Sequence, residues 1–477
     1  MSTSSPRRLV VIGSGFAGVW AALAAARERR RLGRDGSIAI TIVSPHDYLG
    51  IRPRFYEAAF ARAKVELAPL LTPVGVEHVR ATVVAIDKAR RLLQLDAGTL
   101  AYDALVFAAG SATTRPSLPG AELVHDVDSF AAAEATERHL RALAATAAAD
   151  HTAATAAANG AATAAADRAA ATVVVIGGGF TGVEAAAEMA ARLAALFDDR
   201  ARPRVVIVER AATIAPEFGP DARAVIATAL AELGVEVRVS STVAAISRDF
   251  VTLATGETIG AKTVLWTAGV QASPLGRFVA PAADAHGRLA VDDTLRVTSG
   301  EPIWAAGDSA RALVDAAQPA MMSCQHAIPQ GKYAGHNALA WLAGKRPLKY
   351  EQRLYLTCLD IGHWGALITT GFARNEIIGR GLEAKAFKQL INTELIYPPR
   401  DLTEHALMEE AKPPAGGRFI SALFGRILAS PRLRALMLSR AKKTQKSPRI
   451  DAHGGRIVAQ TKPASRGVDL ATCDSCE

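Results

Sequence analysis

Cysteine is scarce in this chain of 477 residues, with four at Cys324, Cys358, Cys473 and Cys476. Such sparse usage excludes a fold built on disulfides and suits a reducing compartment. No uninterrupted apolar run reaches the roughly 18 residues that a membrane-spanning helix needs. The polar N-terminus leads directly into an apolar segment, so we expect no signal peptide.

The bulk composition is that of an ordinary α/β protein. Hydrophobic residues make up 50% of the chain and charged residues 21%, and the length predicts roughly two or three domains. The net charge of +9 is compatible with a basic solvated surface, an anionic membrane surface or nucleic acid as the partner. Composition alone does not choose among them.

A glycine motif follows the first apolar segment. Arg8–Ile12 is rich in β-branched residues and ends in Gly13-x-Gly15-x-x-Gly18. Gly13 allows a tight turn, Gly15 lets the backbone approach a pyrophosphate, and Gly18 permits close helix–strand packing. Phe16 begins an alanine-rich helix whose N-terminus faces the phosphates. The strand, turn and helix together predict a dinucleotide site.

The motif recurs in the middle of the chain. The apolar segment 172–176 runs into the second set of glycines, Gly177, Gly179 and Gly182. Two ordinary strand-to-helix turns are the alternative, but both copies have the full sequence context. The sequence therefore predicts two nucleotide sites in one chain.

An acidic residue closes the second strand of the second site. Arg204–Val208 ends in Glu209, and a carboxylate there accepts the two ribose hydroxyls of NAD and repels the 2′-phosphate of NADP. Arg210 keeps NADP open. At the corresponding place in the first site the sequence has Ser44, whose hydroxyl can still bond a ribose.

Small-residue turns follow later strands. Ala108-Ala109-Gly110 closes one apolar strand, Thr267-Ala268-Gly269 repeats the pattern, and Gly307-Asp308 closes another. Ala109 and Gly110 suit a second approach to the cofactor, Gly269 is the equivalent of Gly110, and Asp308 can hold a ribityl hydroxyl. Because Asp308 comes after the whole second nucleotide unit, the simplest topology is one nucleotide domain split by insertion of the other.

The predicted fold class is therefore α/β, with two Rossmann-like domains and a C-terminal α+β region. We expect an FAD domain at 1–125 and 290–345, a helix with an alanine-rich low-complexity insertion at 126–171, and an NAD(H) domain at 172–289. A quinone and membrane-association region would span 346–443, and a disordered tail 444–477. Within the insertion, we expect a helix over 129–145 and a loop or weakly ordered helix over 146–171.

Several other segments carry candidate chemistry. Arg52-Pro53-Arg54 is expected either beside a flavin ring or in a solvated loop. A meander of strands is predicted over 83–86, 92–95 and 104–108. Cys324–Gly331 opens a helical segment in which Gln325 and Gln330 can line a polar pocket, and His326 is expected to be packed or solvated. A hairpin is predicted at 355–371 and a helix at 383–395 carrying Lys385 and Lys388.

The segment 418–443 is basic and amphipathic, split by Pro431. Its aliphatic and basic residues suit an anionic bilayer surface, with helices docked on their own domain as the alternative. Nucleic acid is not expected, because the basic residues do not alternate with stacking aromatics. Cys473-x-x-Cys476 lacks a second cysteine pair, so no metal site is expected.

Taken together, these motifs resemble the two-dinucleotide flavoproteins, and Gly178–Glu184 with Gln325-x-Ala-x-x-Gln330-Gly331 is similar to the type II NADH dehydrogenase family. The resemblance covers roughly residues 7 to 397. It implies FAD at the first site with Asp308 on its ribityl–phosphate portion, and NADH at the second. It also implies that Glu184 contacts the nicotinamide–flavin region, that Gln325 and Gln330 are quinone-pocket positions, and that the helix with Lys388 walls the quinone tunnel.

The predicted activity is transfer of hydride from NADH to FAD and of electrons to a membrane quinone, without proton pumping, at the cytoplasmic side of the cell membrane as a peripheral protein. Alternatives are a sulfide:quinone oxidoreductase using Cys324 and Cys358, a soluble cytoplasmic NADH:ferredoxin or diaphorase-type reductase, and a redox-switched flavoprotein that binds nucleic acid or a partner. A homodimer stays open.

Overall fold

The computed structural model describes residues 5–154, 160–197, 201–314, 317–352 and 355–414. All of these belong to the first of two units of the chain, residues 1–419, and the second unit covers residues 420–477. The predicted amphipathic helices, the tail and the Cys473–Cys476 pair lie outside the described residues.

The first sheet is parallel and has the strand order β20-β9-β1-β2-β5. Its strands are β1 (Arg7–Ile12), β2 (Ile38–Ser44), β5 (Glu77–Arg80), β9 (Ala104–Phe107) and β20 (Ile303–Ala305). β1 is buried from Leu9 to Ile12, as expected for a strand covered on both faces. β20 follows the second nucleotide unit in the sequence, so the first sheet contains strands from both sides of that unit.

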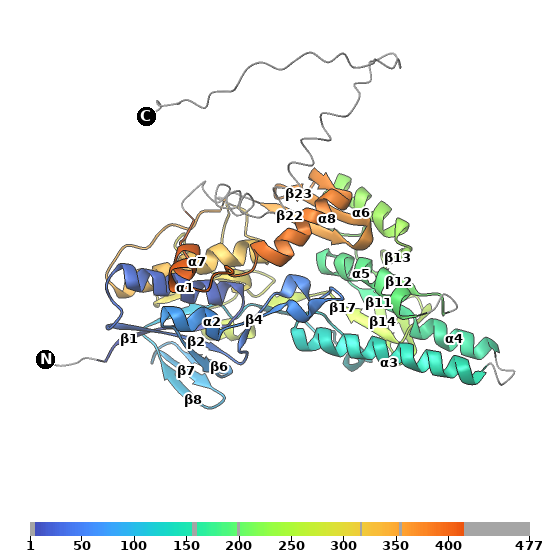
Figure 1. The fold of residues 1–477 in the computed structure, drawn as a ribbon, viewed down its shortest axis with the longest axis horizontal. Coiled ribbons are helices and arrows are strands. Elements are labelled where there is room, and N and C mark those ends of the chain that lie inside the picture. Colours follow the sequence, from blue (N-terminus) through green and yellow to red (C-terminus); the bar gives the residue numbers. More distant parts are fainter. Residues whose placement is uncertain (1–4, 155–159, 198–200, 315–316, 353–354, 415–477) are drawn as a thin grey trace, which may run out of the picture. The chain divides into compact units, whose positions relative to one another are not determined.

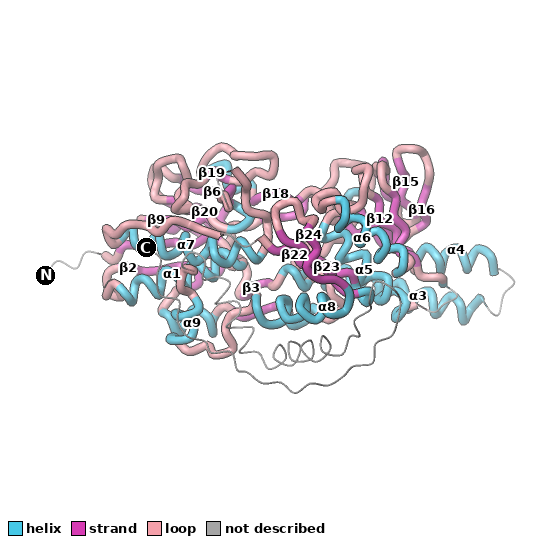
Figure 2. Tube along the Cα trace, turned by 90° about the horizontal axis from the view of Figure 1, so that it is seen from above, coloured by secondary structure: helices cyan, strands magenta, loops and turns pink. Residues whose placement is uncertain are grey.

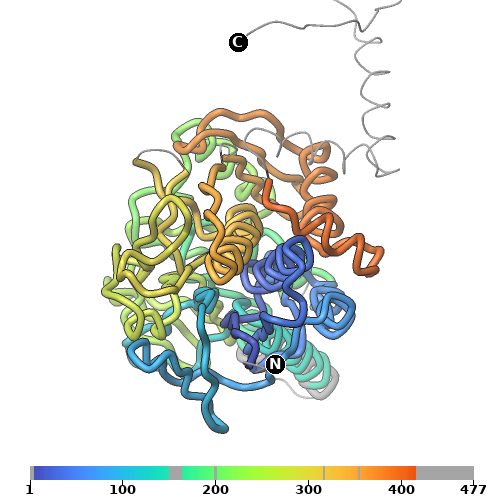
Figure 3. The backbone as a smooth tube through the Cα atoms, turned by 90° about the vertical axis from the view of Figure 1, so that its left-hand side faces the viewer, coloured from blue at the N-terminus to red at the C-terminus, as the bar shows by residue number. Residues whose placement is uncertain are grey.

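Two helices lie side by side on the first sheet, α1 (Phe16–Arg31) and α7 (Cys324–Leu342) (Figures 1 and 3). Their contact is close because α7 presents glycine to α1. A Cβ atom added to Gly331 would overlap the backbone of Ala17, and one added to Gly335 would overlap the backbone of Ala21. The two helices therefore touch backbone to backbone.

The second sheet is also parallel, with the order β13-β12-β11-β17. Its elements are β11 (Thr172–Ile176), α5 (Phe180–Leu196), β12 (Arg204–Val208), α6 (Pro220–Glu232), β13 (Val235–Arg238) and β17 (Thr263–Trp266). Two alanine-rich helices, α3 (Phe130–Ala154) and α4 (Gly160–Ala170), lie beside one another next to this unit (Figure 1). Of the two alternatives for residues 146–171, helix is thus the one observed over most of the segment.

The C-terminal part is built on a three-stranded antiparallel sheet, β22 (Leu356–Ile361), β23 (Gly365–Thr370) and β24 (Glu376–Arg380). Helix α8 (Gly381–Leu390) packs on β23 (Figure 2) and continues into a π-helical turn over Ile391–Leu395. The hairpin and the helix predicted here are both present. Helix α9 (Glu404–Glu410) follows and contacts α1.

Smaller elements surround the two parallel sheets: β3 (Tyr48–Gly50), β4 (Lys64–Glu66), α2 (Ala68–Leu71), β6 (Val83–Asp87), β7 (Leu92–Leu95), β8 (Gly98–Ala101), β10 (Ser111–Thr113), β14 (Val243–Ile246), β15 (Phe250–Leu253), β16 (Thr258–Gly260), β18 (Val270–Ala272), β19 (Leu289–Ala290) and β21 (Ala310–Arg311). The prediction that 104–108 is the third strand of the meander is wrong. The meander consists of β6, β7 and β8, whereas 104–107 pairs with β1 in the parallel sheet.

No helix within the described ranges is long and apolar enough to cross a bilayer.

We predict that Gly335→Ala destabilises the protein, although alanine normally favours a helix interior. The added methyl group meets backbone of Ala21, which cannot move without shifting α1, and such overpacking costs about 1–3 kcal/mol. Urea unfolding of the variant measures the change. Gly36→Ala, where a Cβ meets nothing within 4 Å, is the control, and equal stability of the two variants would contradict the packing account.

Candidate active site

The first glycine motif forms a tight turn between β1 and α1. Gly13 has a φ of +100°, a region that favours glycine, and its N–H donates to the carbonyl of Val43 at 2.9 Å. A Cβ on Gly18 would overlap the backbone of Gly13. A Cβ on Gly15 would meet no atom within 4 Å, so the N-terminus of α1, at Phe16, is approachable.

The carboxyl ends of β9 and β20 meet beside this turn. Asp308 accepts a hydrogen bond from the Ser111 hydroxyl at 2.6 Å, and the same hydroxyl accepts one from Arg52 Nη1 at 2.8 Å. Arg52 also pairs with Asp128, and its Nη1 lies 3.6 Å from Asp308 Oδ2. Ala109 and Gly110 precede Ser111, so the predicted small-residue turn and Gly307-Asp308 come together here.

Ser44 ends β2, and its side chain is used inside the protein. The residue is 2% exposed, its hydroxyl lies 2.8 Å from the hydroxyl of Ser14, and it accepts the N–H of His46 at 3.1 Å. Ser14 lies within the first glycine motif. Ser44 thus links the second strand to the turn of the first.

Gln330 fastens the turn that carries Asp308. Its Oε1 accepts the N–H of Gly307 at 2.8 Å, and its Nε2 lies 3.5 Å from the Tyr350 hydroxyl. The Tyr350 hydroxyl donates a hydrogen bond to Gln352 Oε1 at 2.7 Å, and Gln352 Nε2 donates to the main-chain carbonyl of Gln325 at 3.0 Å. The two predicted glutamines therefore belong to one polar network, with Gln330 buried and directed at main chain.

The second glycine motif repeats the first. Gly177 has a φ of +105° and donates to the carbonyl of Val208 at 2.9 Å, and a Cβ on Gly182 would overlap the backbone of Gly177. Glu209 follows β12, and its carboxylate accepts the N–H groups of Gly178 and Ala211, each at 2.6 Å. These contacts fix the carboxylate beside the motif.

Small-residue turns close this second site as they close the first. Gly269 has a φ of +78° and follows β17, and its carbonyl accepts the N–H of Thr114 at 2.8 Å. The main-chain N–H of Ser273 in turn donates to the carbonyl of Gly110 at 2.9 Å. The two predicted turns, Gly110 and Gly269, are thereby joined through neighbouring main chain.

A buried ion pair joins α5 to α8. The Lys388 Nζ lies 2.9 Å from Glu184 Oε1, and the side chains are only 6% and 4% exposed. Glu184 Oε1 also accepts the N–H of Asp360 at 2.9 Å, and Lys388 donates to the carbonyl of Cys358 at 2.9 Å. Lys385 pairs with the Asp360 side chain.

Burial raises the pKa of Glu184 to about 7, although the charge of Lys388 acts in the opposite direction. Burial also opposes the charge of Lys388, but the carboxylate of Glu184 outweighs it and the pKa of Lys388 is raised. Glu184 can thus change its protonation near neutral pH while Lys388 stays charged. A carboxyl group with such a pKa in a buried cluster is a candidate functional group.

Tyr56 adds a buried hydroxyl to this region. The residue is 3% exposed, and its hydroxyl has no hydrogen-bond partner within the part of the chain that the structure describes. Burial, followed by the charge of Glu184, raises the pKa of Tyr56 well above its usual value. Sequence patterns did not point to Tyr56, because it follows Arg54 in an irregular segment.

The two described cysteines lie in the same region. Burial raises the pKa of the Cys324 thiol to about 11 and that of Cys358 to about 12. Both groups are therefore protonated at neutral pH, and a thiol is a much weaker nucleophile than a thiolate. Within the described residues no group of histidine, cysteine and acidic side chains could hold a metal ion.

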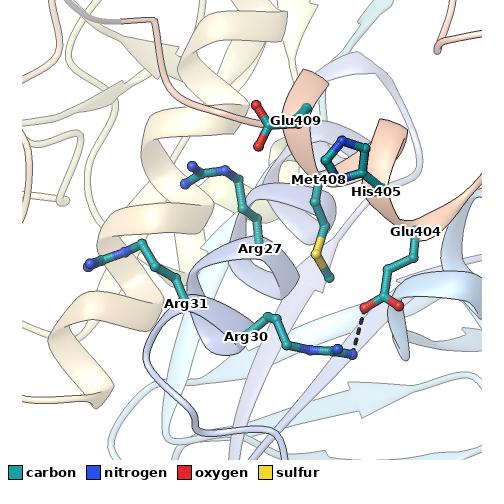
Figure 4. Close-up of a pocket in the computed structure, with 7 residues that line it drawn as sticks. All are labelled: Arg27, Arg30, Arg31, Glu404, His405, Met408 and Glu409. Carbon is teal, nitrogen blue, oxygen red and sulfur yellow. Dashed lines mark ion pairs between the residues drawn. The ribbon is translucent and has the colours of Figure 1, made fainter.

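A separate surface pocket lies between α1 and α9 (Figure 4). It is lined by Arg27, Arg30, Arg31, Glu404, His405, Met408 and Glu409. Arg30 Nη2 and Glu404 Oε1 are 2.6 Å apart and form an ion pair within the pocket. Because Arg30 and Arg31 occupy the last turn of α1, the pocket is at the opposite end of this helix from the glycine motif.

Fold and site together define an α/β oxidoreductase with two nucleotide-binding turns. Residues 7–331 match the pyridine nucleotide-disulphide oxidoreductase family, and the chain belongs to that family. It is 42% identical over 411 residues to an NADH dehydrogenase-like protein of Mycobacterium tuberculosis, covering 85% of this chain and 98% of the relative.

A type II NADH:quinone oxidoreductase of Staphylococcus saprophyticus is 24% identical, with 82% of this chain and 95% of the relative covered. Among solved structures, NDH2 from Plasmodium falciparum in complex with NADH aligns with a TM-score of 0.68 at 13% identity, over 85% of this chain and 98% of that one. The predicted family, fold class and enzyme class, and the expected pair FAD and NADH, are confirmed. The roles of the individual site residues stay predictions.

We predict that Lys388→Met destabilises the protein increasingly as pH rises. Without the charge of Lys388 the pKa of Glu184 rises further. The folded state then keeps a proton on Glu184 that the unfolded chain releases, so stability falls as pH rises above the ordinary pKa of a glutamate. Breaking a buried pair costs about 3–5 kcal/mol of unfolding free energy. We expect the variant to approach this cost at about pH 8.5 and to lose less stability at about pH 6, where Glu184 is protonated. Urea unfolding at both pH values measures this.

The control is Lys349→Met. Lys349 lies 3.6 Å from Asp293, and both side chains are well exposed, at 67% and 60%. Such a pair contributes at most about 1 kcal/mol. The buried-pair account would be refuted if Lys388→Met lowered the unfolding free energy equally at both pH values, or by no more than Lys349→Met does.

Proposed function

We propose that the protein oxidises NADH and reduces a membrane quinone, with FAD bound at the first glycine motif and NADH at the second, and without proton pumping. Two complete strand–turn–helix sites support this, because only the second has a carboxylate, Glu209, at the end of its second strand. Glu209 would accept the ribose hydroxyls of NADH and repel the 2′-phosphate of NADPH. The overall reaction converts NADH, a proton and a quinone into NAD⁺ and a quinol.

The residues around the first motif fit FAD. Gly15 leaves the N-terminus of α1 open to phosphate, as dinucleotide binding requires. Asp308 would hold the ribityl portion, with Ser44, Ala109 and Gly110 lining the adjoining turns. Bound FAD supplies the redox chemistry that links a two-electron donor to a quinone.

The chain's own residues supply positioning and proton control. Glu184 holds its place through Lys388 and the N–H of Asp360. A carboxyl group titrating at about pH 7 would be able to pass a proton to the reduced quinone. Lys388 stays charged beside this carboxyl group. Gln330 acts through Gly307, whose N–H it accepts, and Gln325 stands at the start of the same helix.

The rival functions are weaker. A sulfide:quinone oxidoreductase has no use for a second nucleotide site, yet this chain has a complete second glycine motif with Glu209 fixed beside it. A soluble NADH:ferredoxin or diaphorase-type reductase shares the first half of the reaction and differs in the acceptor. A redox-switched flavoprotein binding nucleic acid or a partner would use the basic surface instead.

Attachment to an anionic membrane surface, at the cytoplasmic side, belongs to the same proposal. The basic amphipathic segment 418–443 would provide it. Co-sedimentation with anionic vesicles tests the attachment, and turnover that is independent of membranes would favour the soluble reductase.

We predict that the purified, FAD-loaded protein oxidises NADH with a short-chain quinone, and that its kcat/KM for NADPH is at least about tenfold lower, because Glu209 faces the 2′-phosphate. Steady-state absorbance of the reduced nucleotide measures both rates. Equal use of NADPH would contradict the role of Glu209. Oxidation of sulfide but not NADH, abolished by Cys324→Ser, would favour the sulfide-oxidising rival.

A further inference from the structure

The second glycine motif is covered by a carboxylate from its own chain. Glu217 lies in the loop between β12 and α6, and its Oε1 accepts the N–H of Phe180, the first residue of α5, at 2.5 Å. A Cβ added to Gly179 would lie 3.2 Å and 3.6 Å from the two carboxylate oxygens. Glu217 therefore lies over the glycine whose missing side chain gives a dinucleotide its approach to the helix.

The first motif has the same backbone, but none of the residues that the structure describes places a carboxylate over its second glycine. Gly15 precedes α1 with φ −73° and ψ −174°, and Gly179 precedes α5 with φ −78° and ψ −168°. A Cβ on Gly15 meets nothing within 4 Å. The two helix N-termini match in backbone geometry, and the carboxylate of Glu217 lies over one of them.

The loop that carries Glu217 is fastened on both sides. The N–H of Ala215 donates to the carbonyl of Gly178 at 2.8 Å, and Phe218 stacks on Phe180 with ring centroids 6.2 Å apart. From the turn between β23 and β24, Arg374 Nη1 lies 3.4 Å from the main-chain carbonyl of Glu217. The main chain is thereby held in place, while the half-buried side chain has its own torsions to rotate.

A carboxylate and a pyrophosphate compete for this position on physical grounds. The N-terminus of a helix attracts anions through its free N–H groups and its dipole. Two anions in the same place repel each other. A dinucleotide whose phosphates use the Phe180 N–H must therefore displace the Glu217 carboxylate.

This inference rests on the proposed function, in which the second site takes NADH. We propose that Glu217 is an internal competitor of the dinucleotide pyrophosphate, displaced at each binding event and returning when the product leaves. It weakens the binding of nucleotides at the second site and sets their affinity. Among the described residues the first site has no such competitor, which suits a cofactor that stays bound, whereas NAD⁺ must leave in every turnover.

The test is binding of ADP-ribose, which carries the pyrophosphate but no nicotinamide, to the FAD-loaded protein by calorimetry. Glu217→Gln removes the charge and Glu217→Ala removes the acceptor. Both are expected to bind ADP-ribose about tenfold more tightly than the unchanged protein, and the KM for NADH should fall. Adenosine, which has no phosphate, should bind equally well to all three.

Glu232→Gln is the matched control. It removes the same charge at the far end of α6, where Glu232 Oε2 accepts the Trp364 indole N–H at 2.8 Å, a bond that glutamine can keep. Its affinity for ADP-ribose should be unchanged.

Weaker binding by the Glu217 variants would overturn the proposal, because Glu217 would then be a ligand contact. Unchanged binding, equal tightening by Glu232→Gln, or no ADP-ribose binding by any variant would overturn it as well. No electron acceptor is present in this experiment, so its outcome is independent of whether a quinone is the acceptor.

Discussion

The buried pair of Glu184 and Lys388 is the interaction on which the arrangement of the site depends. A carboxylate on the inner face of α5 is costly to bury alone, and the charge of Lys388 on α8 together with the N–H of Asp360 makes the ionised form tolerable. The C-terminal sheet and helix are thus tied electrostatically to the second nucleotide unit. The same balance leaves the Glu184 carboxyl with a pKa of about 7.

The two glycine motifs are built alike and differ where their ligands differ. In the first, Ser44 is absorbed into contacts with Ser14 and Gly15 is open. In the second, Glu209 is fixed on the turn and Glu217 covers the helix N-terminus. A resident cofactor at one site and an exchanging substrate at the other are consistent with this asymmetry.

Local features of the site could be predicted from the sequence, because strand, turn and helix are neighbours in the chain. The glycines of both motifs, the strand before Gly307-Asp308 and the acid at Glu209 are of this kind. Contacts between distant segments could not be predicted. Helical spacing does not reveal that Gln330 faces the main chain of Gly307, and nothing local connects Glu217 with Phe180. The family resemblance, and not residue spacing, pointed to Lys388, because its partner Glu184 lies 204 positions away in the chain.

The most direct measurement of the central claim is anaerobic rapid mixing of NADH with the FAD-loaded Glu184→Gln variant, followed by flavin absorbance. If Glu184 and Lys388 organise the contact between nicotinamide and flavin, flavin bleaching should be slower than in the unchanged protein or need more NADH. Glu188→Gln, one turn further along α5, should behave like the unchanged protein. Bleaching by Glu184→Gln at an unchanged rate and NADH concentration would contradict the account.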